Sequence, residues 1–268
     1  MNNISFPKLN IAFDIDPVAV GFPPLGGVHW YGIIIACGII LAYLYCSNIA
    51  KKEGEKSDTI TDIVLYALPV SIVFARTYYV IFSWESYKND LSSIFRIWEG
   101  GIAIYGAVIG AVLTAWIYCK VKKLNVLKIF DICCLGLMIG QFIGRWGNFV
   151  NCEAYGGYCS YPWGMSINGN APVHPTFLYE SLWNFAGFII LSKLHKKRPF
   201  YGYTFFTYLS WYGVGRFFIE GMRSDSLYIG GMRVSQIIAL VCVIAGICAL
   251  AYFSEKHRRK TKNYTIKK

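Results

Sequence analysis

Residues 29–50, HWYGIIIACGIILAYLYCSNIA, decide the fold class of this chain. The stretch contains no Asp, Glu, Lys or Arg, and it begins with the aromatic pair Trp30 and Tyr31. A helix needs about 20 predominantly apolar residues to cross the hydrocarbon core of a bilayer. The stretch therefore predicts a transmembrane helix that enters the membrane at an aromatic belt.

Similar apolar runs follow as far as Phe253, with short polar interruptions. Of the 268 residues, 55% are hydrophobic and only 15% are charged, and the mean hydropathy is +0.42, which exceeds what one soluble core requires. We expect an all-α polytopic membrane protein, a bundle of about seven transmembrane helices at residues 29–50, 60–82, 100–119, 127–150, 175–194, 202–222 and 234–253.

The chain organisation follows from these spans. Residues 1–28 form an N-terminal segment expected to lie along the outer interface, with Phe6, Phe13 and Phe22 in the headgroup layer. Residues 29–255 form a single seven-span domain with an outer loop at 151–175, and residues 256–268 form a basic tail. Basic residues concentrate in alternate loops, at 51–56, 120–128 and 193–198, and in this tail. Cytoplasmic loops are enriched in Lys and Arg, so the amino terminus is predicted outside and the carboxyl terminus in the cytoplasm.

The net charge of +11 does not indicate nucleic-acid binding, because the excess follows these loops and the tail rather than one docking face. The tail is expected to touch anionic lipid headgroups. No metal site is expected, since the four histidines lie on separate segments without a ligand-like spacing. Cys152 and Cys159 lie in the outer loop, where a disulfide and two free thiols are both open.

Arginines inside the apolar stretches carry the functional signal. Arg76, Arg145 and Arg216 lie at membrane depth, where a permanently charged guanidinium is costly without an anionic partner. Arg145, Asn148 and Asn151 recur every three residues and share a face if the helix continues that far. Tyr212, Arg216, Glu220 and Arg223 likewise form one stripe.

These arginines have two interpretations. One is a membrane-embedded anion site, and the other is a set of internal ion pairs, for which the candidate carboxylates are Asp131, Glu153, Glu180 and Glu220. The anion site requires that the guanidinium groups are not all neutralised by acidic neighbours and that a cavity large enough for a glycerophospholipid adjoins them.

Five blocks, HWYGIIIACG, WEGGIAIYGAVIG, GRWGNFVNCEAYG, HPTFLYES and RFFIEGMRSD, resemble the phosphatidylglycerol–prolipoprotein diacylglyceryl transferase family over nearly the whole chain. The most specific block matches the family signature G-R-x-G-N-F-x-N-x-E-x-x-G at residues 144–156. The resemblance implies a multi-pass enzyme of the bacterial cytoplasmic membrane that uses no cofactor. Its partners would be membrane lipids, among them phosphatidylglycerol as substrate, and the signal peptide of a preprolipoprotein.

The implied reaction transfers the diacylglyceryl group of phosphatidylglycerol to the thiol of the lipobox cysteine, forms a thioether and releases glycerol 1-phosphate. By position in the motifs, Arg145 would contact the phospholipid headgroup and Arg216 would assist the departing phosphate. The remaining substrate-binding candidates are Tyr31, Asn148, Asn151, Glu153, Gly156, Glu180, Tyr212, Glu220 and Arg223. The three glutamates would orient the arginines. Tyr31 and Tyr212 fit hydroxyl donors in a lipid pocket and aromatic belt residues equally well.

Tyr105 is the third catalytic candidate, and it departs from the family pattern. Family members often carry a histidine in this block as the proposed base for the thiol. A tyrosine with an ordinary pKa of about 10 is a poor base at neutral pH, so Tyr105 is expected to orient a substrate instead. A positive site can favour the thiolate directly, because a cysteine thiol has a pKa of about 8.5.

Two other classes of function remain open on the residues alone. A transporter or channel for an organic anion would also use intramembrane arginines. An adaptor without chemistry would tolerate the loss of Arg145 and Arg216. The outer loop has the polarity to receive a signal peptide, with Trp163 and Met165 available for apolar contact, and an ordinary surface loop is the alternative.

Overall fold

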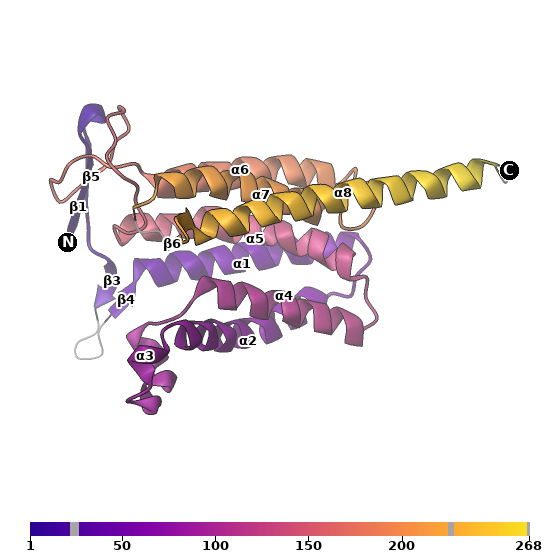
Figure 1. Ribbon diagram of the computed structural model, residues 1–268, viewed down its shortest axis with the longest axis horizontal. Coiled ribbons are helices and arrows are strands. Elements are labelled where there is room, and N and C mark those ends of the chain that lie inside the picture. Colours follow the sequence, from indigo (N-terminus) through magenta and orange to yellow (C-terminus); the bar gives the residue numbers. More distant parts are fainter. Residues whose placement is uncertain (22–26, 225–227, 267–268) are drawn as a thin grey trace. The chain divides into compact units, whose positions relative to one another are not determined.

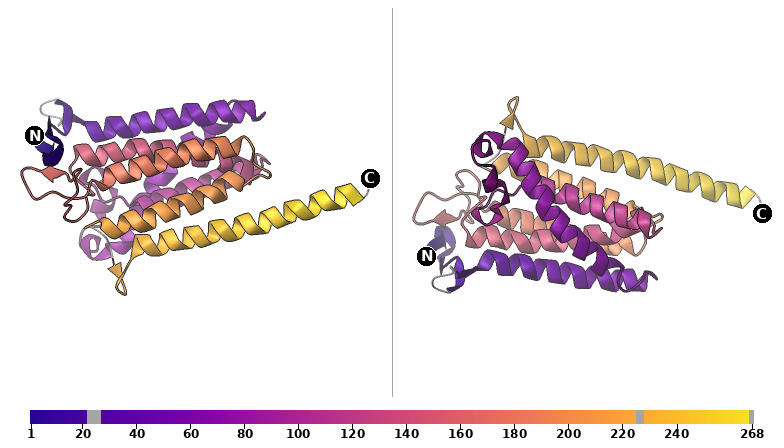
Figure 2. Two further views of the ribbon diagram at one scale, coloured as in Figure 1. Left: turned by 90° about the horizontal axis from the view of Figure 1, so that it is seen from above. Right: turned by 90° about the horizontal axis from the view of Figure 1, so that it is seen from below.

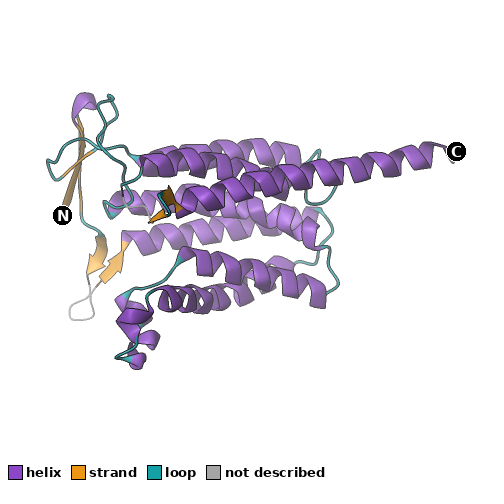
Figure 3. Ribbon diagram, viewed as in Figure 1, coloured by secondary structure: helices purple, strands orange, loops and turns teal. Residues whose placement is uncertain are grey.

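The computed structural model describes residues 1–21, 27–224 and 228–266, and it is mainly helical (Figures 1 and 3). The chain divides into two compact units, one comprising Met1–Leu44 with Phe130–Lys268 and the other comprising Tyr45–Ile129. All seven segments predicted to be helical are helices, at α1 Trp30–Lys52, α2 Thr59–Phe82, α4 Ile104–Val121, α5 Val126–Val150, α6 Thr176–His195, α7 Tyr203–Met222 and α8 Val234–Ile266.

Five of these helices are long and apolar enough to cross a membrane, judged by length and composition over the described residues: α1, α2, α4, α5 and α8. The other two, α6 and α7, have 20 residues each. They carry buried polar residues such as Glu180, Asn184 and Glu220, which lower their hydropathy. The two helices that depart from the membrane pattern are therefore those with the most polar interior.

A reciprocal tryptophan pair joins α6 to α7 in the first unit. Trp183 Nε1 donates to the carbonyl of Trp211 at 3.0 Å, Trp211 Nε1 donates to the carbonyl of Trp183 at 3.1 Å, and the rings stack at 4.5 Å. Each indole occupies the space above a glycine of the opposite helix. A Cβ at Gly187 would lie 2.3 Å from Trp211 Nε1, and a Cβ at Gly215 would lie 2.2 Å from Trp183 Nε1. The two helices thus have a fixed register where the polar residues face each other.

Asp131 caps the amino-terminal end of α7. Its carboxylate is fully buried and accepts hydrogen bonds of 2.8 Å from the backbone N–H groups of Gly202 and Phe205, with Arg198 Nε at 3.5 Å. The first N–H groups of a helix have no partner within the helix, and a carboxylate there is favourable. Asp131, one of the predicted arginine-site partners, therefore serves as the cap of α7.

α8 packs along α7 and continues into the basic tail as helix (Figure 2). A Cβ at Gly213 would lie 2.6 Å from the carbonyl oxygen of Ala239, so the two backbones approach closely there. The basic tail predicted at 256–268 begins within this helix, and its last residues, Lys267 and Lys268, lie outside the described part of the chain.

Short strands depart from the all-α expectation. β1 Asn2–Phe6 pairs antiparallel with β2 Ile11–Ile15 and with β5 Ser166–Ile167 of the outer loop. The 3-10 turn η1 Pro7–Leu9 connects β1 to β2, and two further hairpins are β3 Val18–Gly21 with β4 Gly27–His29, and β6 Tyr228–Ile229 with β7 Met232–Arg233. The sheet exists because Ile4 is fully buried against Met165 and Phe177, which gives the N-terminal segment a small core with the outer loop. Phe22 lies outside the described residues.

The second unit contains α2 and α4, with the connection α3 Trp84–Tyr87, η2 Leu91–Phe95 and η3 Ile97–Glu99 between them. Gly106 of α4 touches α2 so closely that a Cβ would lie 2.3 Å from the carbonyl oxygen of Phe74. Arg76 is buried in α2 and donates to the carbonyls of the connection, to Ile94 at 2.8 Å, Gly100 at 2.7 Å, Gly101 at 2.8 Å, Ser93 at 2.6 Å and Arg96 at 3.5 Å. All of its nitrogen atoms are engaged by backbone, so Arg76 organises this connection.

Candidate active site

Glu180 of α6 is the centre of a cluster of arginines in the first unit. Arg145 Nη2 of α5 lies 2.6 Å from Glu180 Oε2, and Arg216 Nη1 of α7 donates to Glu180 Oε1 at 2.9 Å. Arg223, at the end of α7, lies 3.9 Å from the same oxygen. Glu180 is 4% exposed, so one buried carboxylate joins three guanidinium groups from two helices and the residue after α7.

Glu220 is the second carboxylate of this cluster, one helical turn after Arg216. Its Oε2 lies 2.6 Å from Arg216 Nη2. The same oxygen is buried and has no hydrogen-bond partner of acceptable geometry among the described residues. The contact is therefore a close ion pair with poor alignment, and charge-assisted hydrogen bonds lose much of their strength when misaligned.

The cluster brings together several charges. Arg145, Arg216 and Arg223 carry three positive charges beside the carboxylates of Glu180 and Glu220. Both carboxylates are buried, and electrostatic interactions are stronger there than in water. Guanidinium groups that converge on one carboxylate can also bind another oxyanion.

The end of α5 extends the cluster toward the outer loop through a Schellman motif. Cys152 adopts φ +54°, and its N–H donates to the carbonyl of Phe149 at 3.1 Å. The Glu153 N–H donates to the backbone carbonyl of Asn148 at 3.0 Å. This backbone reversal lets Asn148 Nδ2 donate to Glu153 Oε1 at 2.8 Å, while Arg145 Nη1 donates to Asn148 Oδ1 at 3.2 Å. The signature block thus forms a chain of polar contacts that begins at Glu153 and reaches Glu180 through Asn148 and Arg145.

Two glycines of the signature permit close approach. A Cβ at Gly147 would lie 2.6 Å from the ring of Tyr31, so the absence of a side chain lets Tyr31 pack on the turn of α5 that carries Arg145. The Gly156 N–H donates to the carbonyl of His174 at 2.9 Å. Gly156 also forms an isolated β-bridge with Arg223. Gly156 therefore shapes the backbone next to Arg223.

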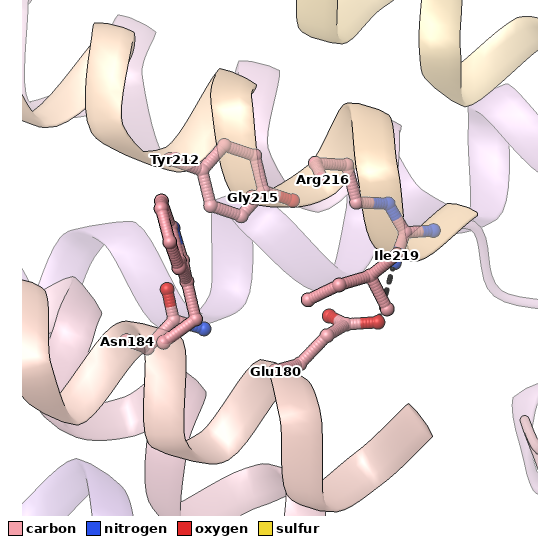
Figure 4. A pocket seen from close by; sticks show the side chains of 7 residues that line it. Glu180, Asn184, Tyr212, Gly215, Arg216 and Ile219 are labelled. Atoms are coloured by element: carbon pink, nitrogen blue, oxygen red, sulfur yellow. Dashed lines mark hydrogen bonds and ion pairs between the residues drawn. The ribbon is translucent and has the colours of Figure 1, made fainter. Parts of the chain in front are cut away.

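A small void adjoins the cluster between α6 and α7 (Figure 4). Its lining residues are Glu180, Trp183, Asn184, Tyr212, Gly215, Arg216 and Ile219. Its free volume is about 10 Å³, which is room for about one water molecule. The void is far smaller than the lipid-sized cavity that the anion site was expected to need.

A second, wholly apolar groove of about 360 Å³ lies near the carboxyl-terminal end of α5. It is lined by Phe6, Leu9, Ile11, Phe13, Trp146, Phe149, Trp163, Phe177 and Leu178. Of the two apolar residues predicted for substrate contact in the outer loop, Trp163 lines this groove. Met165 is 2% exposed and belongs to the core under β1, so it is inaccessible for such contact.

The remaining predicted residues fall in different places. Tyr212 lines the small cavity, and Asn151 lies just after α5 and donates its N–H to the carbonyl of Gly147 at 3.0 Å. Tyr105 lies at the start of α4 in the second unit, with its ring 6.3 Å from that of Tyr78. Cys152 and Cys159 are both free thiols, so no disulfide joins them.

Sequence analysis missed Asn184. It is 3% exposed, lines the cavity, and has a buried Oδ1 without a hydrogen-bond partner among the described residues. Its spacing of four residues from Glu180 places both side chains on one face of α6. That spacing was a usable signal, because an asparagine within an apolar helix usually faces a polar interior.

Comparison with known proteins gives a consistent result. The family described as prolipoprotein diacylglyceryl transferase matches residues 17–252. Among similar curated proteins is the phosphatidylglycerol–prolipoprotein diacylglyceryl transferase of Clostridioides difficile, 47% identical, with 86% of this chain and 93% of the relative aligned. Proteins of the same name from Finegoldia magna, 49% identical over 82% of this chain and 89% of the relative, and from Listeria innocua, 45% identical over 89% and 90%, are also similar.

Proposed function

Because the chain belongs to the prolipoprotein diacylglyceryl transferase family, we propose that it transfers the diacylglyceryl group of phosphatidylglycerol to the lipobox cysteine of a preprolipoprotein. The sulfur of the cysteine attacks the glyceryl carbon, a thioether forms, and the carbon–oxygen bond to phosphate breaks. Glycerol 1-phosphate departs, and the thiol proton leaves to solvent or to the phosphate. The reaction is the first step of lipoprotein maturation.

The contact of Arg145 and Arg216 with one carboxylate is the observation that supports this proposal most strongly. The departing phosphate gains negative charge as the carbon–oxygen bond breaks. Guanidinium groups already aimed at one point stabilise that charge with little reorganisation, and such preorganised electrostatic stabilisation usually lowers an enzyme's activation barrier more than any other effect. Arg216 assists the departing phosphate, Arg145 binds the headgroup, and Glu180 holds both in position.

Binding of substrate requires an exchange of partners within the cluster. A lipid phosphate offers oxygen acceptors that can replace the misaligned contact between Arg216 and Glu220. The convergence of three guanidinium groups on this point makes the exchange favourable. Because the cavity is smaller than a phospholipid, α6 and α7 or their side chains must also move to admit the lipid.

Tyr105 is also proposed to contribute to the reaction. The positive cluster favours the thiolate of the substrate cysteine, and Tyr105 orients a substrate. The activity of Tyr105→Phe as a function of pH tests whether the hydroxyl instead accepts the thiol proton. Turnover near that of the wild type would exclude the hydroxyl as proton acceptor. Loss of the activity of the wild type at neutral or alkaline pH would indicate that it is the acceptor.

The proposed setting is the bacterial cytoplasmic membrane, crossed seven times with the amino terminus outside. α6 and α7 join the five apolar helices as spans, because their polar residues face each other across the cluster. The apolar groove then lies at the outer end of α5. Two of its residues, Trp146 and Phe149, directly follow Arg145 and Asn148, so we place the apolar side chains of the lipobox segment there.

The test is direct. The purified full-length protein is mixed with phosphatidylglycerol and a lipobox peptide, and mass spectrometry measures the mass of the peptide. A diacylglyceryl increment on cysteine is expected, with an inert Cys→Ser peptide as control. Absence of product under conditions in which the Clostridioides difficile relative is active would contradict the proposal, and an organic-anion flux into vesicles without product would favour a transporter.

A further inference from the structure

The small cavity contains a polar atom that nothing in the described part of the protein satisfies. Asn184 Oδ1 is buried and has no hydrogen-bond donor within reach among the described residues. An unpaired buried acceptor costs about 1–3 kcal/mol, so such atoms are rare unless a ligand or water fills the gap. In Figure 4, Asn184 lies on one side of the cavity, and the hydrogen bond between Arg216 and Glu180 lies on the other.

The missing group must be a hydrogen-bond donor, because Oδ1 can only accept. If the proposed function holds, the phospholipid offers donors in one place only, the hydroxyl groups of its headgroup glycerol. Its phosphate and its ester groups are acceptors. An acceptor near Arg216 therefore complements a headgroup that has both a phosphate and a hydroxyl.

The void is small in the structure as it stands. Its free volume of about 10 Å³ is room for about one water molecule. The headgroup glycerol therefore reaches Asn184 only when α6 and α7 or their side chains move, as the proposed function already requires. The phosphate then lies at Arg216, and the acyl chains stay outside.

We infer that Asn184 is a specificity-determining residue of the lipid site, which accepts a hydrogen bond from a headgroup hydroxyl while Arg216 binds the phosphate. This inference rests on the proposed function. It explains selectivity for phosphatidylglycerol over other phospholipids by the buried side-chain amide of Asn184 in α6. A site that satisfies a buried polar atom with a substrate hydroxyl rejects analogues that lack the hydroxyl.

The experiment compares two lipids of identical acyl chains and headgroup charge, phosphatidylglycerol and phosphatidylpropanol, which has no headgroup hydroxyl. The wild type is expected to prefer phosphatidylglycerol by about 10-fold or more in kcat/KM. Asn184→Leu removes the acceptor at similar volume and should bring this ratio to within about twofold. The ratio should fall mainly because kcat/KM for phosphatidylglycerol decreases.

Ile219→Val provides the matched control, because Ile219 lines the same cavity without a polar atom. It should change both rates equally and preserve the ratio. If Asn184→Leu does not fold, Asn184→Ala removes the acceptor without adding bulk. Equal rates of the wild type with both lipids, or an unchanged ratio in the Asn184 variant, would overturn the inference. A wild type inactive with every lipid would instead contradict the proposed transferase function.

Discussion

Arg76 and Arg216 both lie within long helices with little exposure to solvent, but their partners differ. Arg76, in the second unit, donates to five backbone carbonyls, from Ser93, Ile94, Arg96, Gly100 and Gly101. Arg216, in the first unit, contacts two carboxylates, and one of these contacts is poorly aligned. Their positions in the sequence did not distinguish the two arginines, whereas their hydrogen-bond and ion-pair partners do.

We expect this difference to decide which of the two arginines can bind a ligand. The guanidinium of Arg76 has no nitrogen left for an anion, and breaking its bonds would expose carbonyls of the connection. In our proposal, a phosphate replaces carboxylate contacts of Arg216 with little loss of favourable interaction. The carbonyl partners of Arg76 therefore indicate a structural role, and the carboxylate partners of Arg216 fit the proposed chemistry.

The largest expected effect is on activity. Arg216→Lys keeps the charge but loses the planar pair of donors that reaches Glu180 and Glu220. We expect kcat/KM to fall by about 100-fold, the usual loss when one donor to a developing oxyanion is removed, with little change in melting temperature. The peptide lipidation assay and thermal unfolding measure both quantities. Activity near that of the wild type would remove Arg216 from the chemistry.

The same substitution in the other region should have the opposite effect. Arg76→Lys supplies three donors for five carbonyls, so at least two of these acceptors lose their partner. We expect the free energy of unfolding to fall by about 2–3 kcal/mol, with activity per folded molecule within about twofold of the wild type. A large fall in activity without a loss of stability would show that Arg76 is functional, and the contrast between the two arginines would be wrong.

Gly215 tests the packing that aligns α6 with α7. A Cβ there would overlap with the indole of Trp183, so Gly215→Ala should lower the free energy of unfolding by about 1–3 kcal/mol and lower activity. Gly221→Ala is the matched control, because its Cβ would lie at an ordinary 3.4 Å from Gln236 Nε2. Denaturant unfolding and the lipidation assay give the comparison, and equal behaviour of the two variants would count against a fixed register.

The Schellman motif gives a smaller effect. Cys152 has φ +54°, which β-branched residues tolerate poorly, so Cys152→Val should cost about 1–2 kcal/mol and displace Glu153 from Asn148. Cys152→Gly adopts the same conformation without strain and should retain activity within about twofold. Similar activity of the two variants would show that the position of Glu153 does not matter.

The smallest expected effect concerns the reactivity of the same residue. Burial raises the pKa of the Cys152 thiol above its ordinary value. The folded protein therefore holds this proton more tightly than the unfolded chain does, and the stability it contributes is lost as the pH rises through the folded pKa. Alkylation of Cys152 at pH 8 should be slower in the native protein than after unfolding, as peptide mass spectrometry can measure. Equal rates would contradict a buried thiol.

Much of the fold could be predicted because apolar periodicity and length are local properties. All seven predicted helical segments are helices, with ends shifted by a few residues. The strands could not be predicted, because the N-terminal segment becomes a sheet only by burying Ile4 against Met165 of the distant outer loop. The spans, their orientation and the single membrane domain stay predictions.

The candidate site divides in the same way. The signature block and the stripe on α7 identified Arg145 and Arg216 from spacing alone. Four carboxylates were available to pair with them, and spacing could not choose among them. The fold selects Glu180 for three arginines and assigns Asp131 to the start of α7. Asn184 was identified only from the structure, because its Oδ1 has no hydrogen-bond partner among the described residues.

The sequence by itself determined a helical membrane protein of this transferase family with arginines inside its helices, because composition, helix length and motif residues need no knowledge of contacts. Tertiary structure alone decided which arginine is structural and which carboxylate joins the others. It also decided where a small polar cavity adjoins the cluster. The physical reason is that ion pairing and burial depend on which helices pack together. That packing is determined by residues far apart in the chain.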